Sequence, residues 1–195
     1  KSLIERNLVQ EYFLQKDRLE AYQGDIEEIE KLTDEQFRAK KEIDEAFAEG
    51  KNVLLHGVTS SGKTHIYLEK IEDVVASEKN VLFLLPEISL TKQIVQRLEK
   101  KYGKQLGFYH QKLTDFERVE VWRRMKNNDI KILIGTRNAL FLPFQNLGLI
   151  VIDEEQESSY KSEKTPCYHA RETAIERARQ EKANVVMGSA TPTIE

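Results

Sequence analysis

The chain has 195 residues, of which 39% are hydrophobic and 32% are charged, and its formal net charge at pH 7 is −3. This length suits one large domain with a buried core plus a smaller piece, and the acidic balance gives no global signal for nucleic-acid binding, although a groove can be basic locally. The single cysteine, Cys167, excludes an internal disulfide and a cysteine-cluster zinc site within these residues. Without a membrane-length apolar run or a signal-peptide pattern, we expect a cytoplasmic protein with no membrane partner.

The first 30 residues differ in character from the rest of the chain. They are dense in charge and contain no nucleotide-binding motif. Their apolar residues are spaced for the end of a helix followed by two short strands, 11–14 and 19–22. We therefore expect a small helix-plus-hairpin segment over residues 1–30 and one domain over residues 31–195.

Apolar runs with strand character alternate with amphipathic helical patterns through residues 31–195. Such alternation predicts a parallel sheet covered by helices on both faces. Right-handed crossovers then make a doubly wound, mostly parallel α/β layer, with ligands at the carboxyl ends of the strands. The expected strands are 53–56, 81–85, 130–135, 149–153 and 185–188, and the expected helices are 63–76, 91–101, 114–127 and 168–180.

The stretch Gly57-Val-Thr-Ser-Ser-Gly-Lys-Thr64 fits every fixed position of the phosphate-binding loop pattern and lies between a strand and a helix, as that loop requires. Glycines let backbone N–H groups surround phosphate oxygens, and the helix N-terminus adds its dipole. Lys63 is expected to reach the β- and γ-phosphates of ATP, and Thr64 to bind Mg²⁺. The alternative is a glycine-rich turn before an ordinary helix. The candidate ATP-binding residues of the loop are Gly57, Val58, Thr59, Ser60, Ser61, Gly62, Lys63 and Thr64.

Three acids follow the apolar run 149–152. Asp153 stands at the carboxyl end of this expected strand, where it is positioned to hold Mg²⁺ opposite Thr64. Glu154 is expected to accept a proton from the attacking water, because phosphoryl transfer depends on positioning and electrostatics around the metal. The pattern alone also fits a strand that ends in solvated acids, and the upstream loop favours the metal site. Lys63 and Glu154 are therefore candidate catalytic residues.

Five further stretches discriminate among ATPases. They are Leu32-Thr-Asp-Glu-Gln36, Leu85-Pro-Glu-Ile-Ser-Leu-Thr91, Gly135-Thr-Arg-Asn-Ala-Leu-Phe141, Ser158-Ser-Tyr-Lys161 with Tyr168-His-Ala-Arg171, and Gly188-Ser-Ala-Thr-Pro192. In this order and spacing they resemble the motifs of superfamily 2 helicases. More narrowly, they are similar to the first, RecA-like motor lobe of the PriA family of primosomal replication-restart DNA helicases, and the resemblance covers nearly all of residues 32–195.

The resemblance implies DNA contacts in loops at the ends of central strands. Pro86 and Glu87 fall in one such loop, and Thr136 and Arg137 fall in another. Hydroxyl, guanidinium and amide groups there can hold the phosphate backbone without reading bases. Taken alone, Arg137 reads as a surface arginine, but its place after a strand and a Gly-Thr pair favours the phosphate role.

The loop 160–171 is rich in aromatic and basic residues and follows the acids directly. Aromatic rings stack on bases and cations hold phosphates, and the resemblance implies that this loop couples DNA contact to ATP hydrolysis. The alternative is a surface loop that leads into a helix at about residue 168. The candidate DNA-contacting residues of the loop are Tyr160, Lys161, Tyr168 and Arg171.

Two glutamines complete the expected site. Thr33-Asp-Glu-Gln36 is a capping box, in which the glutamine bonds back to the cap, whereas the resemblance implies that Gln36 reads the adenine edge of ATP. Both interpretations stand. Gln156, a candidate catalytic residue, occupies a place where the family usually has a titratable His. Its amide is expected to donate a hydrogen bond toward the γ-phosphate and to accept one from the coupling segment of Ser189 and Thr191.

The resemblance implies a parent protein that is an ATP-driven 3′-to-5′ DNA helicase of replication restart at stalled or repaired forks. It also implies a winged-helix remnant in residues 1–30, zinc bound outside this chain, and other primosome or single-stranded-DNA-binding proteins as partners. Two alternatives are a superfamily 2 translocase or remodeller that does not separate strands, and a nucleotide-binding module that never hydrolyses. With the second motor lobe expected elsewhere, this chain alone is expected to hold ATP poorly and to be almost inactive.

Overall fold

A single six-stranded sheet forms the centre of the molecule, and the computed structural model describes residues 32–58, 61–86 and 92–192. The strand order is β1-β8-β5-β2-β4-β3, and every neighbouring pair is parallel. The strands are β1 (Val53–His56), β2 (Asn80–Leu84), β3 (Leu106–Tyr109), β4 (Ile132–Gly135), β5 (Leu147–Ile152) and β8 (Asn184–Ser189). The expectations for residues 1–30, Thr59, Ser60 and Glu87 fall outside the described residues.

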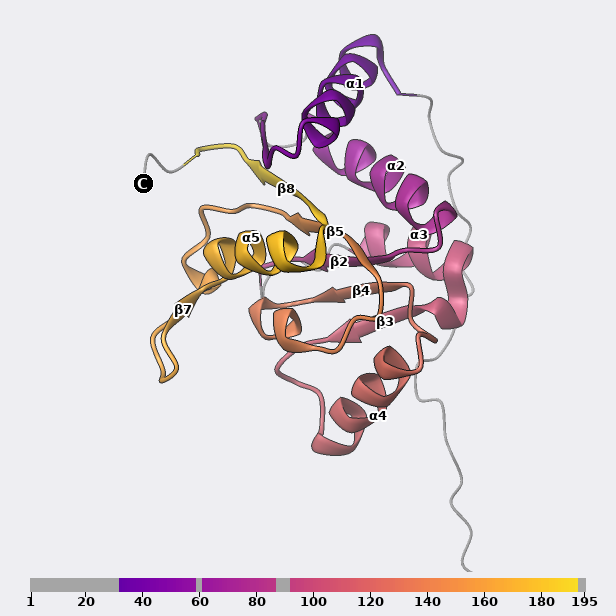
Figure 1. The fold of residues 1–195 in the computed structure, drawn as a ribbon, viewed down its shortest axis with the longest axis vertical. Coiled ribbons are helices and arrows are strands. Elements are labelled where there is room, and N and C mark those ends of the chain that lie inside the picture. Colours follow the sequence, from indigo (N-terminus) through magenta and orange to yellow (C-terminus); the bar gives the residue numbers. More distant parts are fainter. Residues whose placement is uncertain (1–31, 59–60, 87–91, 193–195) are drawn as a thin grey trace, which may run out of the picture.

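Helices cover both faces of this sheet (Figure 1), as expected for a doubly wound layer. One face packs against α1 (Asp34–Ala48), α2 (Lys63–Ala76) and α3 (Lys92–Tyr102), and the other against α4 (Asp115–Lys126) and α5 (Ala170–Glu181). Successive strand residues serve opposite faces: Leu82 belongs to the core under α4 and α5, and Phe83 to the core under α2. The central strands β2 and β5 are therefore buried along their whole length, and the expected fold class is confirmed.

Strand β3 was not expected from the sequence. Residues 106–109 are only four, include a glycine, and form the edge of the sheet, where the last two side chains are half-buried. A short edge strand of this kind carries too little apolar periodicity to stand out. The short 3₁₀ helices η1 (Gly103–Gln105), η2 (Arg137–Phe141) and η3 (Ser158–Tyr160) join the main elements.

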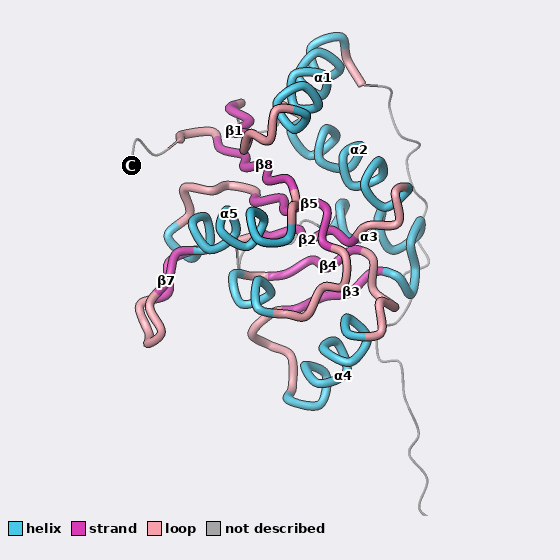
Figure 2. Tube along the Cα trace, in the orientation of Figure 1, coloured by secondary structure: helices cyan, strands magenta, loops and turns pink. Residues whose placement is uncertain are grey.

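A two-stranded antiparallel hairpin, β6 (Lys161–Ser162) and β7 (Tyr168–His169), projects from the body of the molecule (Figure 2). The sequence pattern placed the start of the following helix at residue 168, and this was wrong. His169 has extended backbone angles and its ring nitrogen accepts a hydrogen bond from the N–H of Arg171, so α5 begins at Ala170. In the described part of the chain, no helix is long and apolar enough to cross a membrane.

Candidate nucleotide-binding site

The carboxyl ends of all six strands meet at one edge of the sheet, because every strand runs in the same direction. Backbone hydrogen bonds join the segments that leave this edge. The N–H of Gly57 donates to the carbonyl of Ser189 (3.1 Å), and the N–H of Glu155 donates to the carbonyl of Gly188 (2.9 Å). Three stretches far apart in sequence are thereby held side by side: the glycine-lysine-threonine loop, the acidic run and the segment 189–192.

The loop after β1 has the form of a phosphate cradle closed around a lysine. The ammonium of Lys63 donates to the carbonyls of Gly57 (2.6 Å) and Val58 (3.2 Å), and its side chain is buried. Gly62 caps α2 with φ = 84°, a left-handed conformation that favours glycine. An ammonium held by carbonyl oxygens at a helix N-terminus is poised to exchange these partners for phosphate oxygens. The described residues therefore fit the triphosphate of ATP.

Gln36 takes part in a capping box, as one of the two interpretations expected. Its side-chain oxygen accepts from the N–H of Thr33 (2.9 Å), and the hydroxyl of Thr33 accepts from the N–H of Gln36 (3.3 Å). Its amide nitrogen also lies against the phosphate-binding loop, since a Cβ added to Gly62 would meet this atom at 2.0 Å. Capping thus uses the oxygen and leaves the amide nitrogen directed at the loop.

Asp153 and Glu154 begin where β5 ends. Burial raises the pKa of the Asp153 carboxyl above its ordinary value, and the neighbouring charge of Glu154 raises it further. The charge of Lys63 acts in the opposite direction and lowers the pKa of this carboxyl. A divalent cation beside a half-buried carboxylate stabilises its charged form. The oxygen donors Asp153 and Thr64 therefore fit Mg²⁺.

Gln156 joins the acidic run to β8 through both ends of its amide. Its nitrogen donates to a carboxylate oxygen of Glu154 (2.7 Å), and its oxygen accepts from the hydroxyl of Ser189 (2.5 Å). The hydroxyl oxygen of Ser189 accepts in turn from the N–H of Thr191 (3.2 Å). The hydrogen bond from Ser189 is the one expected from the sequence. A continuous polar chain therefore runs from Glu154 to the segment after β8.

Tyr160 lies in the core, which corrects its interpretation as a residue that stacks on DNA. Its side chain is 1% exposed, and its hydroxyl donates toward the carbonyls of Asp153 (2.7 Å) and Leu84 (3.1 Å). The aromatic pattern of the loop could not distinguish a ring folded inward from one turned to solvent. In this position Tyr160 ties the start of the acidic run to the end of β2.

The remaining candidates for DNA contact divide into two groups. Arg137 donates to the carbonyl of Ser159, so the start of η2 is linked to η3. The hydroxyl of Tyr168 donates to the side-chain oxygen of Asn138 (2.7 Å), so the start of η2 is also linked to the hairpin. The ring of Tyr168 packs edge-on against Phe141, with 5.0 Å between centroids. Lys161 is exposed on β6, whereas Pro86 and Thr136 are buried beside His110.

Arg171 faces the acidic run. Its guanidinium pairs with Glu155 at 3.2 Å and with Glu172 at 3.6 Å, and the side chain of Glu155 is buried. The sequence pattern predicted no role for Glu155, although its place inside a run of three acids was a visible signal. In this arrangement Arg171 anchors α5 to the acidic run, and its expected contact with DNA phosphates stays a prediction.

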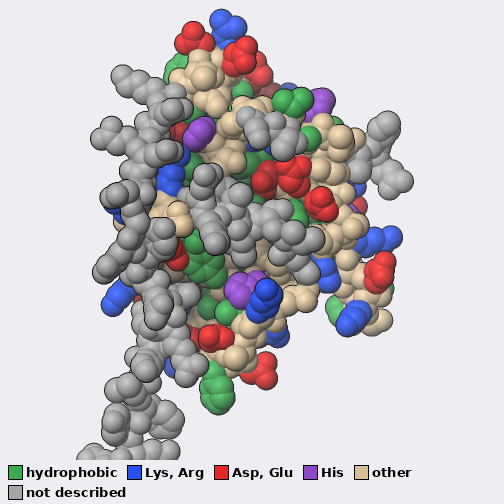
Figure 3. All heavy atoms as spheres, turned by 180° about the vertical axis from the view of Figure 1, so that it is seen from behind, with side chains coloured by type: hydrophobic (Ala, Val, Ile, Leu, Met, Phe, Trp, Pro, Cys, Tyr) green, Lys and Arg blue, Asp and Glu red, His purple; other side chains and the backbone are tan. Residues whose placement is uncertain are grey.

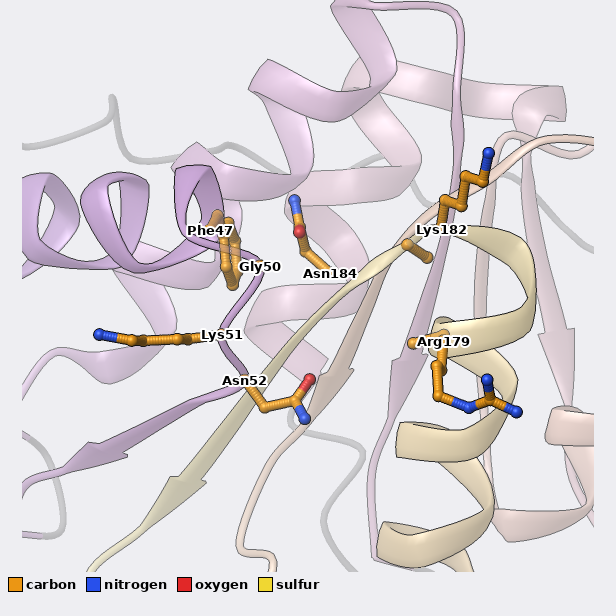
Figure 4. Close-up of a pocket in the computed structure, with 9 residues that line it drawn as sticks. Phe47, Gly50, Lys51, Asn52, Arg179, Lys182 and Asn184 are labelled. Carbon is orange, nitrogen blue, oxygen red and sulfur yellow. The ribbon is translucent and has the colours of Figure 1, made fainter.

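A separate hollow lies at the opposite edge of the sheet (Figure 4). It has a volume of about 310 Å³ and lies between the ends of α1 and α5 and the starts of β1 and β8. Labelled residues around it include Phe47, Lys51, Asn52 and Arg179. Because ligands of doubly wound sheets bind at the carboxyl edge, this hollow is not the candidate nucleotide site.

Acidic and basic side chains are interspersed over the described surface seen in Figure 3.

A parallel sheet whose carboxyl edge brings together a Gly-Lys-Thr loop, an Asp-Glu pair and a Ser-Ala-Thr segment defines the class: an ATP-binding helicase lobe. The comparisons agree. The family model for DEAD/DEAH box helicases matches residues 33–195, and the chain belongs to this family.

Individual members of the family show which helicases the chain is similar to, namely PriA proteins. The chain is 46% identical over 200 residues to the replication restart protein PriA of Bacillus subtilis, covering 100% of this chain and 25% of that protein. It is 50% identical over 150 residues to PriA of Haemophilus influenzae, covering 76% of this chain and 20% of that protein. These findings confirm the resemblance found in the sequence, and the chain spans about a quarter or less of each relative.

Solved structures confirm the fold. A structure of RecG bound to a three-way DNA junction has a TM-score of 0.61 at 25% identity, covering 84% of this chain and 21% of that one. The helicase domain of Pyrococcus furiosus Hef has a TM-score of 0.60 at 20% identity, covering 83% of this chain and 33% of that one.

Proposed function

We propose that this chain is the first motor lobe of an ATP-driven DNA helicase that moves 3′ to 5′ and acts in replication restart. The observation that supports this most is the carboxyl edge, where Lys63 lies in the loop carbonyls and faces the carboxylate of Asp153. The likeness to PriA relatives supplies the direction of travel, the fork substrate and the partner proteins as proposals. We place this work in the cytoplasm because the relatives are replication restart proteins.

The chemistry divides among residues at this edge. Lys63 and the loop N–H groups hold the β- and γ-phosphates, and Thr64 and Asp153 are the residues that would hold Mg²⁺. When bound there, Mg²⁺ supplies positive charge beside the phosphates. Glu154 accepts the proton of the attacking water, and the amide of Gln156 orients that carboxylate through its 2.7 Å hydrogen bond.

DNA contact is proposed for the loops that leave the same edge. Pro86, Glu87 and Thr136 lie in or beside the loops after β2 and β4, where backbone groups can hold phosphates. Arg137, Lys161 and Tyr168 lie on η2 and the hairpin. Since Arg137 bonds to Ser159, next to Tyr160, a shift of either DNA loop would reach Asp153 through few contacts.

The site is proposed to be one half of an active site. The second motor lobe supplies the arginines that neutralise charge on the γ-phosphate, and such a residue is worth roughly 10³–10⁵ in rate. We propose that this lobe, a zinc site and the surfaces for primosome proteins belong to parts of the parent protein beyond these residues. Gln36 is proposed to contact adenine with the amide nitrogen that capping leaves available.

Substitution of the loop lysine tests the proposal. In the full-length protein, Lys63→Ala is expected to abolish ATP hydrolysis and unwinding. Fork DNA binding should stay within about twofold of wild type, because Lys63 lies in the phosphate loop and the proposed DNA contacts lie on other loops. The matched control is Lys51→Ala, at the opposite edge of the sheet, which should preserve all three activities. Steady-state phosphate release measures ATP hydrolysis by each variant, and a DNA titration measures its affinity for fork DNA. Near-normal turnover by Lys63→Ala would exclude the loop as the phosphate site.

A further inference from the structure

Tyr67 is a buried phenol that packing alone does not explain. The residue projects from α2 into the sheet, is 0% exposed, and packs edge-on against Phe83 with 5.9 Å between ring centroids. Its hydroxyl oxygen is also buried and forms no hydrogen bond of standard geometry with the described residues. Phenylalanine would fill the same volume without burying an oxygen, and buried polar atoms normally have a partner. The hydroxyl therefore requires a separate account.

Gly188 provides the space for this hydroxyl. A Cβ added to Gly188 would lie 1.5 Å from the hydroxyl oxygen of Tyr67, so any larger residue would collide with it. The same point lies 3.4 Å from the Oδ1 atom of Asp153. The phenol oxygen and the carboxylate thus share one small space in front of the Gly188 backbone. A phenol can donate a hydrogen bond, and an ionised carboxylate can only accept.

The position of Tyr67 on α2 links it to the phosphate loop. It lies three residues after Thr64 and four after Lys63, so the three side chains project from the same face of the helix. Lys63 and Thr64 begin the helix at the phosphate loop, and Tyr67 is one turn deeper. From there its hydroxyl oxygen and the Oδ1 atom of Asp153 both lie close to Gly188.

We propose that Tyr67 is a positioning residue that donates a hydrogen bond to Asp153 and holds its carboxylate in the orientation that binds the metal. This inference rests on the proposed function, because it assigns Asp153 to Mg²⁺. Carboxylates that bind metals are themselves held by hydrogen bonds, and loss of such a partner typically lowers metal affinity or activity by about 10–100-fold. Gly188 is then required, because Tyr67 and Asp153 pack against its backbone and leave no room for a side chain.

Metal binding by the full-length protein tests this role. With Mn²⁺ as the probe and ADP present, Tyr67→Phe is expected to raise the metal dissociation constant about tenfold, measured by electron paramagnetic resonance of free Mn²⁺. ATP turnover should recover to within about twofold of wild type at saturating Mg²⁺, because a positioning residue shifts metal affinity more than the chemical step. Tyr102→Phe, a phenol on α3 away from this edge, is the matched control and should leave both quantities unchanged.

The variant Asp153→Asn distinguishes a failure of the positioning role of Tyr67 from a failure of the proposed metal site. If this variant weakens Mn²⁺ binding and Tyr67→Phe leaves it within twofold of wild type, Asp153 is a metal ligand and the positioning role of Tyr67 is wrong. If neither variant changes Mn²⁺ binding, the proposed metal site itself is wrong.

A paired substitution gives a readout independent of metal. Gly188→Ala should lower the thermal unfolding midpoint through its collision with the hydroxyl, and Tyr67→Phe in the same protein should restore part of that loss. No recovery in the double variant would contradict the proposed packing of the hydroxyl against Gly188.

Discussion

A glutamine stands where the PriA resemblance leads one to expect a histidine, and its two hydrogen bonds show what the amide can do there. Gln156 donates to Glu154 and accepts from Ser189. An amide keeps both bonds at any physiological pH, because it does not titrate. The amide within the polar chain from Glu154 to Thr191 is therefore independent of pH, and the coupling that we propose for this chain depends on the direction of the amide.

Gln156→Glu tests this dependence at nearly constant volume. The change removes the N–H donor to Glu154 and places a second carboxylate beside it. Loss of a hydrogen bond to a charged group costs about 1.5–3 kcal/mol, so ATP turnover of the full-length protein should fall roughly 10–100-fold. Gln180→Glu is the control, because Gln180 also donates to a glutamate, Glu176, but on the exposed face of α5. Equal turnover by both variants would show that the amide of Gln156 does not serve catalysis.

At the scale of elements, α1 is tied to α2 by two lysines. Lys40 pairs with Glu69 (3.0 Å) and Asp73 (3.2 Å), and Lys70 pairs with Asp44 and Asp73 (3.3 Å to Asp73). The side chain of Lys70 is 6% exposed, whereas Asp44 is 50% exposed. Because α1 carries Gln36 and α2 begins at the phosphate loop, these ion pairs fix the position of the glutamine against Gly62.

Lys70→Met should lower the free energy of unfolding of this chain by about 1–2 kcal/mol. Methionine keeps the apolar stem and removes the charge, and the exposure of Asp44 limits the loss. Lys41→Met is the control, since its pair with Glu45 is exposed on both sides and should contribute less than about 1 kcal/mol. Urea unfolding of both variants measures the difference, and equal stabilities would contradict a structural role for the buried lysine.

The hairpin of β6 and β7 carries a half-buried aromatic ring, Tyr168, and an exposed lysine, Lys161. Replacing Tyr168 and Lys161 by Ala in the full-length protein should leave basal ATP turnover within about twofold. Stacking on a base is worth about 1–3 kcal/mol, so about tenfold more single-stranded DNA should be needed for half-maximal stimulation. Phe116→Ala, which removes an exposed ring from α4, is the control. Unchanged stimulation in the double variant would make the hairpin an ordinary surface feature.

At the scale of the whole molecule, the sequence was sufficient for the doubly wound α/β class, for five of the six strands of the main sheet and for the edge where the site forms. Its loop, acidic run and final segment each follow an apolar strand, and parallel strands bring such ends together. What it did not show depended on contacts between distant residues. Tyr160 reaches the carbonyl of Leu84, which lies 76 positions earlier, so its burial left no local pattern. Strand β3 is defined by its pairing with β4 and not by its own composition.

The role proposed for Tyr67 could not be predicted from the sequence for the same reason, because it depends on contacts between distant residues. In the sequence it was one apolar residue of a helical pattern, and the partnership with Gly188 and Asp153 needs α2, β8 and β5 in place together. Gln36 shows the reverse case. Its capping box was a local pattern and is present in the structure, while its contact with Gly62 emerged only from the packing of α1 on α2.

The central claim is that this edge is one half of an ATP site. Steady-state phosphate release from residues 1–195, with and without single-stranded DNA, tests it directly against the full-length protein. We predict that the chain folds but releases phosphate at least about 10³-fold more slowly, because the arginines that complete the site are proposed to come from a second lobe, and that DNA does not restore the rate. Release at the rate of the full-length protein would show that these residues form a complete catalytic site, and the two-lobe account would be wrong.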